Sequence, residues 1–221
     1  MTAAPLPSGI QGLVFDLDGT LVDSYGAIGK SLNHARRSFG HAPLSDAEVR
    51  QAVGHGLESL IADSLGEEHV AEGVRLFRER YAEVYAGATH LLPGVADGLA
   101  ALGQRGLPMT VASNKPARFG RAIVESLEIA HHFVDVLGPD VVGTTKPEPT
   151  MIRRCLELMA VAPEQALYVG DMVLDVESGR RAGVHVALVE GGSAGRDQLL
   201  QTGLPVFSSL TGLLAALAAA G

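Results

Sequence analysis

Apolar and polar residues follow two different periods along this chain. Over most of the sequence, short apolar runs of strand length are separated by segments with helical spacing. Such alternation is typical of a parallel sheet covered by helices on both faces. We therefore expect the α/β fold class with a doubly wound parallel sheet. Helices are expected from Pro116, from about Pro147, over 176–183 and at the end of the chain, and strands at 10–15, 108–113, 133–138, 166–171, 184–190 and 204–207.

One long block does not follow this alternation. From Ser24 to about Tyr85 the apolar spacing is almost wholly helical. Within it, Ser45 and Glu48 have the spacing of a capping box, which predicts the start of a helix. Because the block interrupts the alternation after its first strand, we interpret it as an inserted domain. The expected division is an α/β core at 1–22 and 92–221 and a helical domain at 23–91.

Composition and charge narrow the range of partners. The formal net charge is −8, Trp is absent and aromatic residues make up 5%, so a nucleic-acid partner is not expected. The Ala-rich tail is too short for a membrane span, and no signal peptide is expected at residues 1–9. The single cysteine, Cys155, has the neighbours of a core residue and excludes an intrachain disulfide. We expect a cytoplasmic protein without a membrane partner, either a monomer or a homodimer.

Polar residues follow the expected strands at the ends where open α/β sheets bind ligands. Asp16 and Asp18 come directly after the first strand. Carboxylate oxygens suit Mg²⁺, whereas N–H donors and a lysine suit phosphoryl oxygens. The sequence therefore predicts a site for magnesium and phosphate at this edge. Its other members are a hydroxyl, an amide, a lysine and two acids, namely Ser113, Asn114, Lys146, Asp171 and Asp175.

The spacing of the first two acids has a chemical use. Side chains two residues apart on an extended segment point the same way, so Asp16 and Asp18 can face one site. One carboxylate can then attack phosphorus while the other handles the proton of the leaving group. Gly19 allows a sharp turn close to a ligand, and Thr20 can hold that turn by hydrogen bonding.

Four segments together resemble the motifs of a known superfamily. They read DLDGTLVDS, VASNKP, KPEP and GDMVLD, and their order resembles that of the haloacid dehalogenase superfamily. The helical insertion is similar to the C1 cap of that superfamily. Within it, the chain most resembles the phosphoglycolate phosphatase group. The resemblance implies a Rossmann-like core with an all-helical cap. It also implies a magnesium-dependent phosphatase for a small phosphorylated metabolite, 2-phosphoglycolate being the first candidate.

The resemblance also implies roles for individual residues. Asp16 would be the nucleophile that forms an aspartyl-phosphate, and Asp18 would be the general acid and then the base. Lys146 would balance the charge around nucleophile and phosphate. Ser113 and the Asn114 backbone would bind phosphoryl oxygens, and Thr20 is placed with them among the substrate-binding residues.

The resemblance implies a metal site as well. Mg²⁺ would be held by the Asp16 carboxylate, the Asp18 backbone carbonyl and Asp171, with Asp175 as a further ligand or as a partner of the ligands. Met172 departs from the pattern, because relatives often have Ser or Thr there. That departure puts in doubt a hydrogen bond that would support the metal site, but it does not put in doubt Asp171 as a metal ligand.

The loop between two expected cap helices is a candidate for substrate recognition. Gly54, His55 and Gly56 lie in it, and in C1-capped relatives a loop of this region faces the active site. We expect these residues to contact the leaving group, the alternative being a structural turn between helices. Arg50 is a weaker candidate for an anion contact.

Three other features have structural interpretations. Lys115 is interpreted as a surface residue or as a neighbour of the ligand-binding residues. The glycine-rich segment 191–195 lacks the lysine and spacing of a P-loop, so we interpret it as a flexible turn. His131 and His132 are expected at a helix end, because no partner lies at the spacing of a zinc site.

Two other functions use similar residues. A sugar phosphomutase would form the same aspartyl-phosphate and pass the phosphoryl group to another substrate hydroxyl. A signalling receiver domain also gathers acids, a hydroxyl and a lysine at strand ends. Asp18, which would speed hydrolysis, and the cap both count against a receiver domain, whereas the mutase and a phosphatase for another metabolite stay open.

Overall fold

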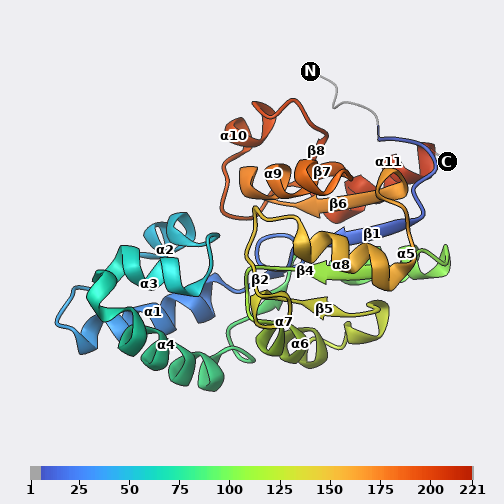
Figure 1. Ribbon diagram of the computed structural model, residues 1–221. Helices are drawn as coiled ribbons and strands as arrows, with labels where there is room; N and C mark the ends of the chain where they lie inside the picture. The colour runs from blue at the N-terminus through green and yellow to red at the C-terminus, as the bar shows by residue number, and fades with distance from the viewer. Residues whose placement is uncertain (1–5, 221) are drawn as a thin grey trace.

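A six-stranded parallel sheet forms the centre of the molecule (Figure 1), in a computed structural model that describes residues 6–220. Its strand order is β5-β4-β1-β6-β7-β8, which confirms the expected fold class. Because β4 and β6 flank β1, the residues that follow these three strands meet at one edge. The strands span Gly12–Phe15 (β1), Met109–Ala112 (β4), Val136–Leu137 (β5), Ala166–Gly170 (β6), His185–Val189 (β7) and Val206–Phe207 (β8).

Helices cover both faces of this sheet, as the side chains of β1 show. Leu13 and Phe15 belong to one buried cluster with residues of α5, α6 and α11, whereas Val14 belongs to a second cluster with residues of α8 and α9. Successive side chains of a strand point to opposite faces, so a strand buried on both faces is apolar throughout. The helices are α5 (Val95–Gln104), α6 (Ala117–Ser126), α8 (Thr150–Met159), α9 (Val173–Ala182) and α11 (Leu210–Ala220).

Four further α-helices form a layer beside the sheet, which we call the cap (Figure 1). Its interior is apolar, with Leu32, Ile61 and Tyr81 among the buried side chains. Ser45 and Glu48 form the expected capping box. Two antiparallel strands carry the chain into the cap and out of it. The elements are β2 (Val22–Asp23), α1 (Tyr25–Ser38), α2 (Asp46–Ala52), α3 (Leu57–Leu65), η1 (Glu67–His69), α4 (Val70–Val84) and β3 (His90–Leu91).

Some local elements differ from the expectation. Helix α8 begins at Thr150 instead of about Pro147, because a proline disfavours helical backbone in the residue before it and Glu148 precedes Pro149. His131 and His132 lie at the end of a helix as expected, although this helix is a short 3₁₀ turn, η2 (Ala130–His132). The short elements α7 (Pro139–Val142), η3 (Pro163–Gln165) and α10 (Arg196–Leu200) were not expected.

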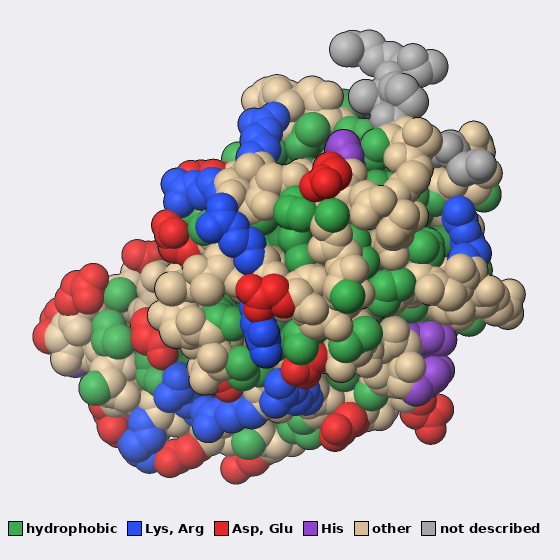
Figure 2. All heavy atoms as spheres, turned by 45° about the vertical axis from the view of Figure 1, so that its right-hand side comes forward, with side chains coloured by type: hydrophobic (Ala, Val, Ile, Leu, Met, Phe, Trp, Pro, Cys, Tyr) green, Lys and Arg blue, Asp and Glu red, His purple; other side chains and the backbone are tan. Residues whose placement is uncertain are grey.

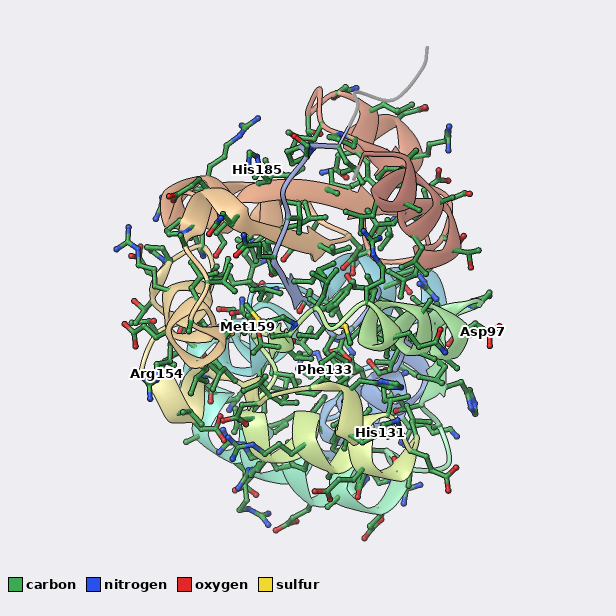
Figure 3. The ribbon with its side chains drawn as sticks, turned by 90° about the vertical axis from the view of Figure 1, so that its right-hand side faces the viewer. Asp97, His131, Phe133, Arg154, Met159 and His185 are labelled. Carbon is green, nitrogen blue, oxygen red and sulfur yellow. The ribbon has the colours of Figure 1, made fainter. Side chains whose placement is uncertain are left out.

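The surface carries charges of both signs. Figure 2 shows Lys and Arg side chains interspersed with Asp and Glu over the face that it presents. In Figure 3, Asp97 and Arg154 lie at the rim of the view, and Phe133 and Met159 lie nearer its middle; Met159 is buried and Phe133 is half-buried. Within residues 6–220 no helix is long and apolar enough to cross a bilayer. The first five residues of segment 1–9, where no signal peptide was expected, lie outside the described residues.

Candidate active site

Three buried carboxylates gather where β1 and β6 end. One oxygen of each of Asp16, Asp171 and Asp175 lies within 4.8 Å of the others. Asp16 directly follows β1 and Asp171 directly follows β6, while Asp175 lies in the first turn of α9. The topology therefore brings acids together that are about 155 positions apart in the sequence, as expected from the strand-end argument.

Lys146 is the cation of this cluster. Its Nζ lies 2.9 Å from Asp16 Oδ1 and 2.7 Å from Asp175 Oδ1, and it donates a hydrogen bond to the Tyr168 hydroxyl at 3.0 Å. Its backbone N–H donates to Asn114 Oδ1 at 2.7 Å, which fixes the loop that carries it. Burial alone would lower the pKa of the ammonium group, but the two carboxylates raise it above its usual value. Lys146 is therefore charged at neutral pH.

Asp16 is held in an environment that disfavours its charge. Burial raises its pKa to about 6; the negative charges of Asp175 and Asp18 add to the rise, and Lys146 opposes it. Although Lys146 is close, none of the described residues donates a hydrogen bond of suitable geometry to Asp16 Oδ1. A buried carboxylate oxygen without a donor is costly, and it is available to a ligand.

In contrast to Asp16, both carboxylate oxygens of Asp175 accept hydrogen bonds. Its Oδ1 accepts hydrogen bonds from Lys146 Nζ at 2.7 Å and from the Tyr168 hydroxyl at 2.8 Å. Its Oδ2 accepts from the backbone N–H groups of Asp171 at 3.1 Å and Met172 at 3.0 Å, and so caps the N-terminus of α9. Of its two expected roles, these contacts favour that of a partner which positions Lys146 and Asp171.

Asp171 is covered by a loop that follows β7. Its Oδ1 accepts from Thr20 Oγ1 at 3.2 Å, and its Oδ2 accepts from the Ser193 backbone N–H at 2.8 Å. A Cβ atom at Gly192 would lie 1.8 Å from Asp171 Oδ2. Burial, then the charges of Asp175 and Asp16, raise the pKa of Asp171 well above its usual value. Segment 191–193 was interpreted as part of a flexible turn, but its backbone packs directly on this acid.

Asp18 lies outside the cluster of three acids and contacts other partners. It is paired with Lys115, whose Nζ lies 2.9 Å from Asp18 Oδ2, and it accepts a hydrogen bond from Ser24 Oγ. The Lys115 side chain is only 8% exposed, so of the two interpretations of this lysine the surface residue is wrong. Gly19 adopts a φ of +83°, and a Cβ there would lie 2.7 Å from Asp171 Oδ2, so only glycine fits this turn.

Comparison with known proteins agrees with this geometry. Residues 13–189 match the family of haloacid dehalogenase-like hydrolases. This chain belongs to that family. It is 34% identical to phosphoglycolate phosphatase 1 of Pseudomonas aeruginosa over 91% of this chain and 78% of that protein. It is 33% identical to the phosphoglycolate phosphatase of Escherichia coli K12 over 94% and 92% of the two chains. A haloacid dehalogenase-like hydrolase from Streptococcus pneumoniae superposes with a TM-score of 0.85 at 26% identity, covering 94% and 98% of the two chains.

In this haloacid dehalogenase-like hydrolase, a cavity that is partly open to solvent lies between the sheet edge and the cap. Its floor is polar and includes Asp16, Asp18, Ser113, Asn114 and Lys146. The cap side is apolar, with contributions from α1, α3 and α4. An ester whose phosphoryl group lies on the floor would therefore present its alcohol to the cap.

The expected binding residues of the floor have distinct contacts. Ser113 Oγ accepts from the Lys115 backbone N–H at 3.3 Å, which keeps this hydroxyl at the cavity. Asn114 Nδ2 donates to the Gly54 carbonyl of the cap at 3.0 Å. The Asn114 side chain therefore connects the cap to the loop of Lys146, which it also bonds.

The cap loop contributes backbone and not its histidine. Gly54 and Gly56 line the cavity, whereas His55 is exposed and is absent from the lining. The structure therefore does not bring His55 together with the other expected site residues. Arg50 also lies outside the cavity: it donates to the Gly191 carbonyl at 2.9 Å and pairs with Asp23 at 3.3 Å.

One functional neighbour of the site, Tyr168, was missed from the sequence. Tyr168 was read only as part of an apolar strand, yet its hydroxyl contacts both Lys146 and Asp175. The pattern of a buried strand does not show that the hydroxyl of one of its side chains contacts charged groups.

Cys155 is a core residue as expected, and burial raises the pKa of its thiol to about 12, so it is not a reactive thiolate.

Proposed function

We propose that this hydrolase is a magnesium-dependent phosphatase that cleaves a small phosphomonoester, with 2-phosphoglycolate as the first candidate substrate. The observation that carries the proposal is the pair of Asp16 and Asp18. Asp16 lies on the floor of the cavity beside Lys146, with a carboxylate oxygen that has no hydrogen-bond donor among the described residues. Asp18 lies two residues later in the same cavity, on the side of the cap. Relatives named phosphoglycolate phosphatase support the choice of substrate.

The first half-reaction uses both acids. A carboxylate oxygen of Asp16 attacks phosphorus, the bond from phosphorus to the ester oxygen breaks, and Asp18 donates a proton to the departing alkoxide. The product is an alcohol and an aspartyl-phosphate on Asp16. Lys146 offsets the charge that gathers near Asp16, and its hydrogen bonds to Asp175 and Tyr168 hold it in place.

The second half-reaction returns the enzyme to its starting state. Asp18, now ionised, takes a proton from a water molecule, and the oxygen of that water attacks phosphorus. The bond between phosphorus and Asp16 then breaks, so that phosphate leaves and the carboxylate is restored. Ser113 Oγ and the backbone N–H of Asn114 are placed at the cavity floor to bind phosphoryl oxygens during both steps.

The acids around Asp16 fit a divalent cation. Asp16 and Asp171 would supply carboxylate oxygens, with the Asp18 backbone carbonyl beside them, and Asp175 would orient this set through the N–H of Asp171. When bound, Mg²⁺ would neutralise the carboxylates and the phosphoryl oxygens. A single buried cysteine, Cys155, is in keeping with the reducing cytoplasm that we propose as its location.

Phosphate release from a panel of phosphorylated metabolites tests the proposal. The purified protein with Mg²⁺ should release inorganic phosphate, and Asp16→Asn should lower the rate by on the order of 10⁴-fold or more. Asp97→Asn, at an exposed position of α5, is the matched control and should leave the rate unchanged. A fully active Asp16→Asn variant would contradict the mechanism. Label that moves between positions of a sugar phosphate, without release of phosphate, would identify a mutase instead.

A further inference from the structure

Only two cations line the cavity among the residues that the structure describes, Lys146 and Lys115. Lys146 belongs to the floor, where Asp16, Asp175 and Tyr168 already surround it. Lys115 lies on the side of the leaving alcohol, next to Asp18. Lys115 is therefore the cation of the described lining that lies nearest to a negative charge on the alcohol part of a substrate.

Lys115 is fixed in place by groups from both sides of the cavity. Its Nζ lies 2.9 Å from Asp18 Oδ2, and it stands 4.8 Å from the centre of the Tyr81 ring of α4. The face of an aromatic ring attracts a cation and leaves the hydrogen-bond donors of that cation free for other acceptors. An ammonium group has three donors, so Lys115 can serve a second acceptor besides Asp18. The Tyr81 hydroxyl is buried and has no hydrogen-bond partner within the described part of the chain.

The apolar wall on this side offers no charged partner to an anion. It is made of aliphatic and aromatic side chains of the cap and of α6, namely Ile28, Val53, Leu57, Leu60, Phe77 and Phe119. An ionised group that leaves water for such a wall without a partner is strongly disfavoured. A neutral alcohol part would be disfavoured much less there than an anionic one, which would depend on Lys115 for its charged partner.

We propose that Lys115 binds a carboxylate on the leaving alcohol, so that the substrate class is the phosphate esters of short 2-hydroxy acids. This inference rests on the proposed phosphatase function. Because Lys115 Nζ and Asp18 Oδ2 are 2.9 Å apart, a substrate whose ester oxygen contacts Asp18 can reach Lys115 with a carboxylate that lies close to that oxygen, at roughly 3 Å. A carboxylate on the carbon that bears the phosphate has this separation. Lys115 is then the residue that selects the substrate.

Two esters of equal length separate this role from a merely structural one. One is 2-phosphoglycolate, and the other is 2-hydroxyethyl phosphate, in which a neutral CH₂OH replaces the carboxylate. The wild-type enzyme should have a kcat/KM at least about 10-fold higher for the carboxylate ester, because a hydrogen bond between charged groups contributes roughly 1.5–3 kcal/mol. Lys115→Met should remove this preference, mainly through KM, and Lys115→Arg should restore part of it.

The controls decide between the two roles. Lys30→Met, at an exposed position of α1, should leave both values of kcat/KM unchanged, and circular dichroism should show that each variant is folded. Equal losses for the two esters in Lys115→Met would overturn the proposal, since Lys115 would then only position Asp18. A wild-type enzyme without preference for the carboxylate would overturn it even if the variant fails to fold. If neither ester nor any other phosphomonoester is hydrolysed, the proposed function fails and this inference fails with it.

Discussion

The charge of Asp16 should make the metal-free protein less stable as the pH rises. Its pKa is about 6 in the folded protein against an ordinary value of 3.8, chiefly because of burial. The folded state therefore binds this proton more tightly than the unfolded chain does. Between pH 3.8 and 6 the native state carries more protons, so this contribution is fully present below 3.8 and is lost as the pH rises through 6.

The magnitude follows from the two pKa values. A rise from 3.8 to about 6 corresponds to on the order of 3 kcal/mol, of which about 2 kcal/mol falls between pH 4.5 and pH 7.5. Asp16→Asn has nearly the same shape and cannot ionise. The free energy of unfolding of both proteins is measured by urea unfolding with EDTA at several pH values. The difference between Asp16→Asn and the wild type should shift by about 2 kcal/mol in favour of the variant from pH 4.5 to pH 7.5.

Added Mg²⁺ provides the second half of this test. At pH 7.5, Mg²⁺ at 100 times its dissociation constant should stabilise the wild type by about 2.7 kcal/mol. Asp16→Asn should gain less, because it lacks one charged ligand. If the wild type and the variant show the same dependence on pH, Asp16 is not the buried, destabilised carboxylate described here. If Mg²⁺ stabilises neither protein, the acids do not form a metal site.

Three further substitutions probe the surroundings of the site. Lys146→Met should lower the free energy of unfolding by about 3–5 kcal/mol in urea unfolding at pH 7.5, because it leaves buried carboxylates without their cation. Gly192→Ala should weaken Mg²⁺ binding in a calorimetric titration, because its Cβ would lie 1.8 Å from Asp171 Oδ2, whereas Gly195→Ala, with open space around it, should not. Arg50→Gln should change the free energy of unfolding by no more than about 1 kcal/mol, because its ion pair is exposed.

The parallel sheet was predictable because its strands are buried on both faces. Leu13, Val14 and Phe15 are fully buried, and only such strands read as unbroken apolar runs between helices. The strand-end rule then placed Asp16 and Asp171 together without any knowledge of distances. A local apolar pattern is sufficient to predict strands that bury all their side chains. The parallel topology then brings together the residues that follow those strands.

The parts that were not predictable depend on contacts between distant segments. A glycine-rich stretch such as 191–193 reads as a turn, and only the fold shows that it packs on Asp171. Lys115 reads as exposed because lysine usually is, and its burial follows from the position of the cap above it. His55 was expected at the site because of its place in a cap loop, but the direction of a loop side chain is set by the packing of the helices around it.

The balance of charges in the site explains why its acids need a bound cation in addition to the two lysines. In their ionised forms, the carboxylates of Asp16, Asp18, Asp171 and Asp175 face two lysines, of which one is engaged with Asp18 alone. Four negative and two positive charges leave −2, which a single divalent cation would neutralise. The phosphoryl group of a substrate then brings new negative charge to a site of nearly zero net charge instead of a repulsive one. Because one lysine serves the floor and the other serves the cap side, the enzyme can bind phosphate and leaving group with separate cations.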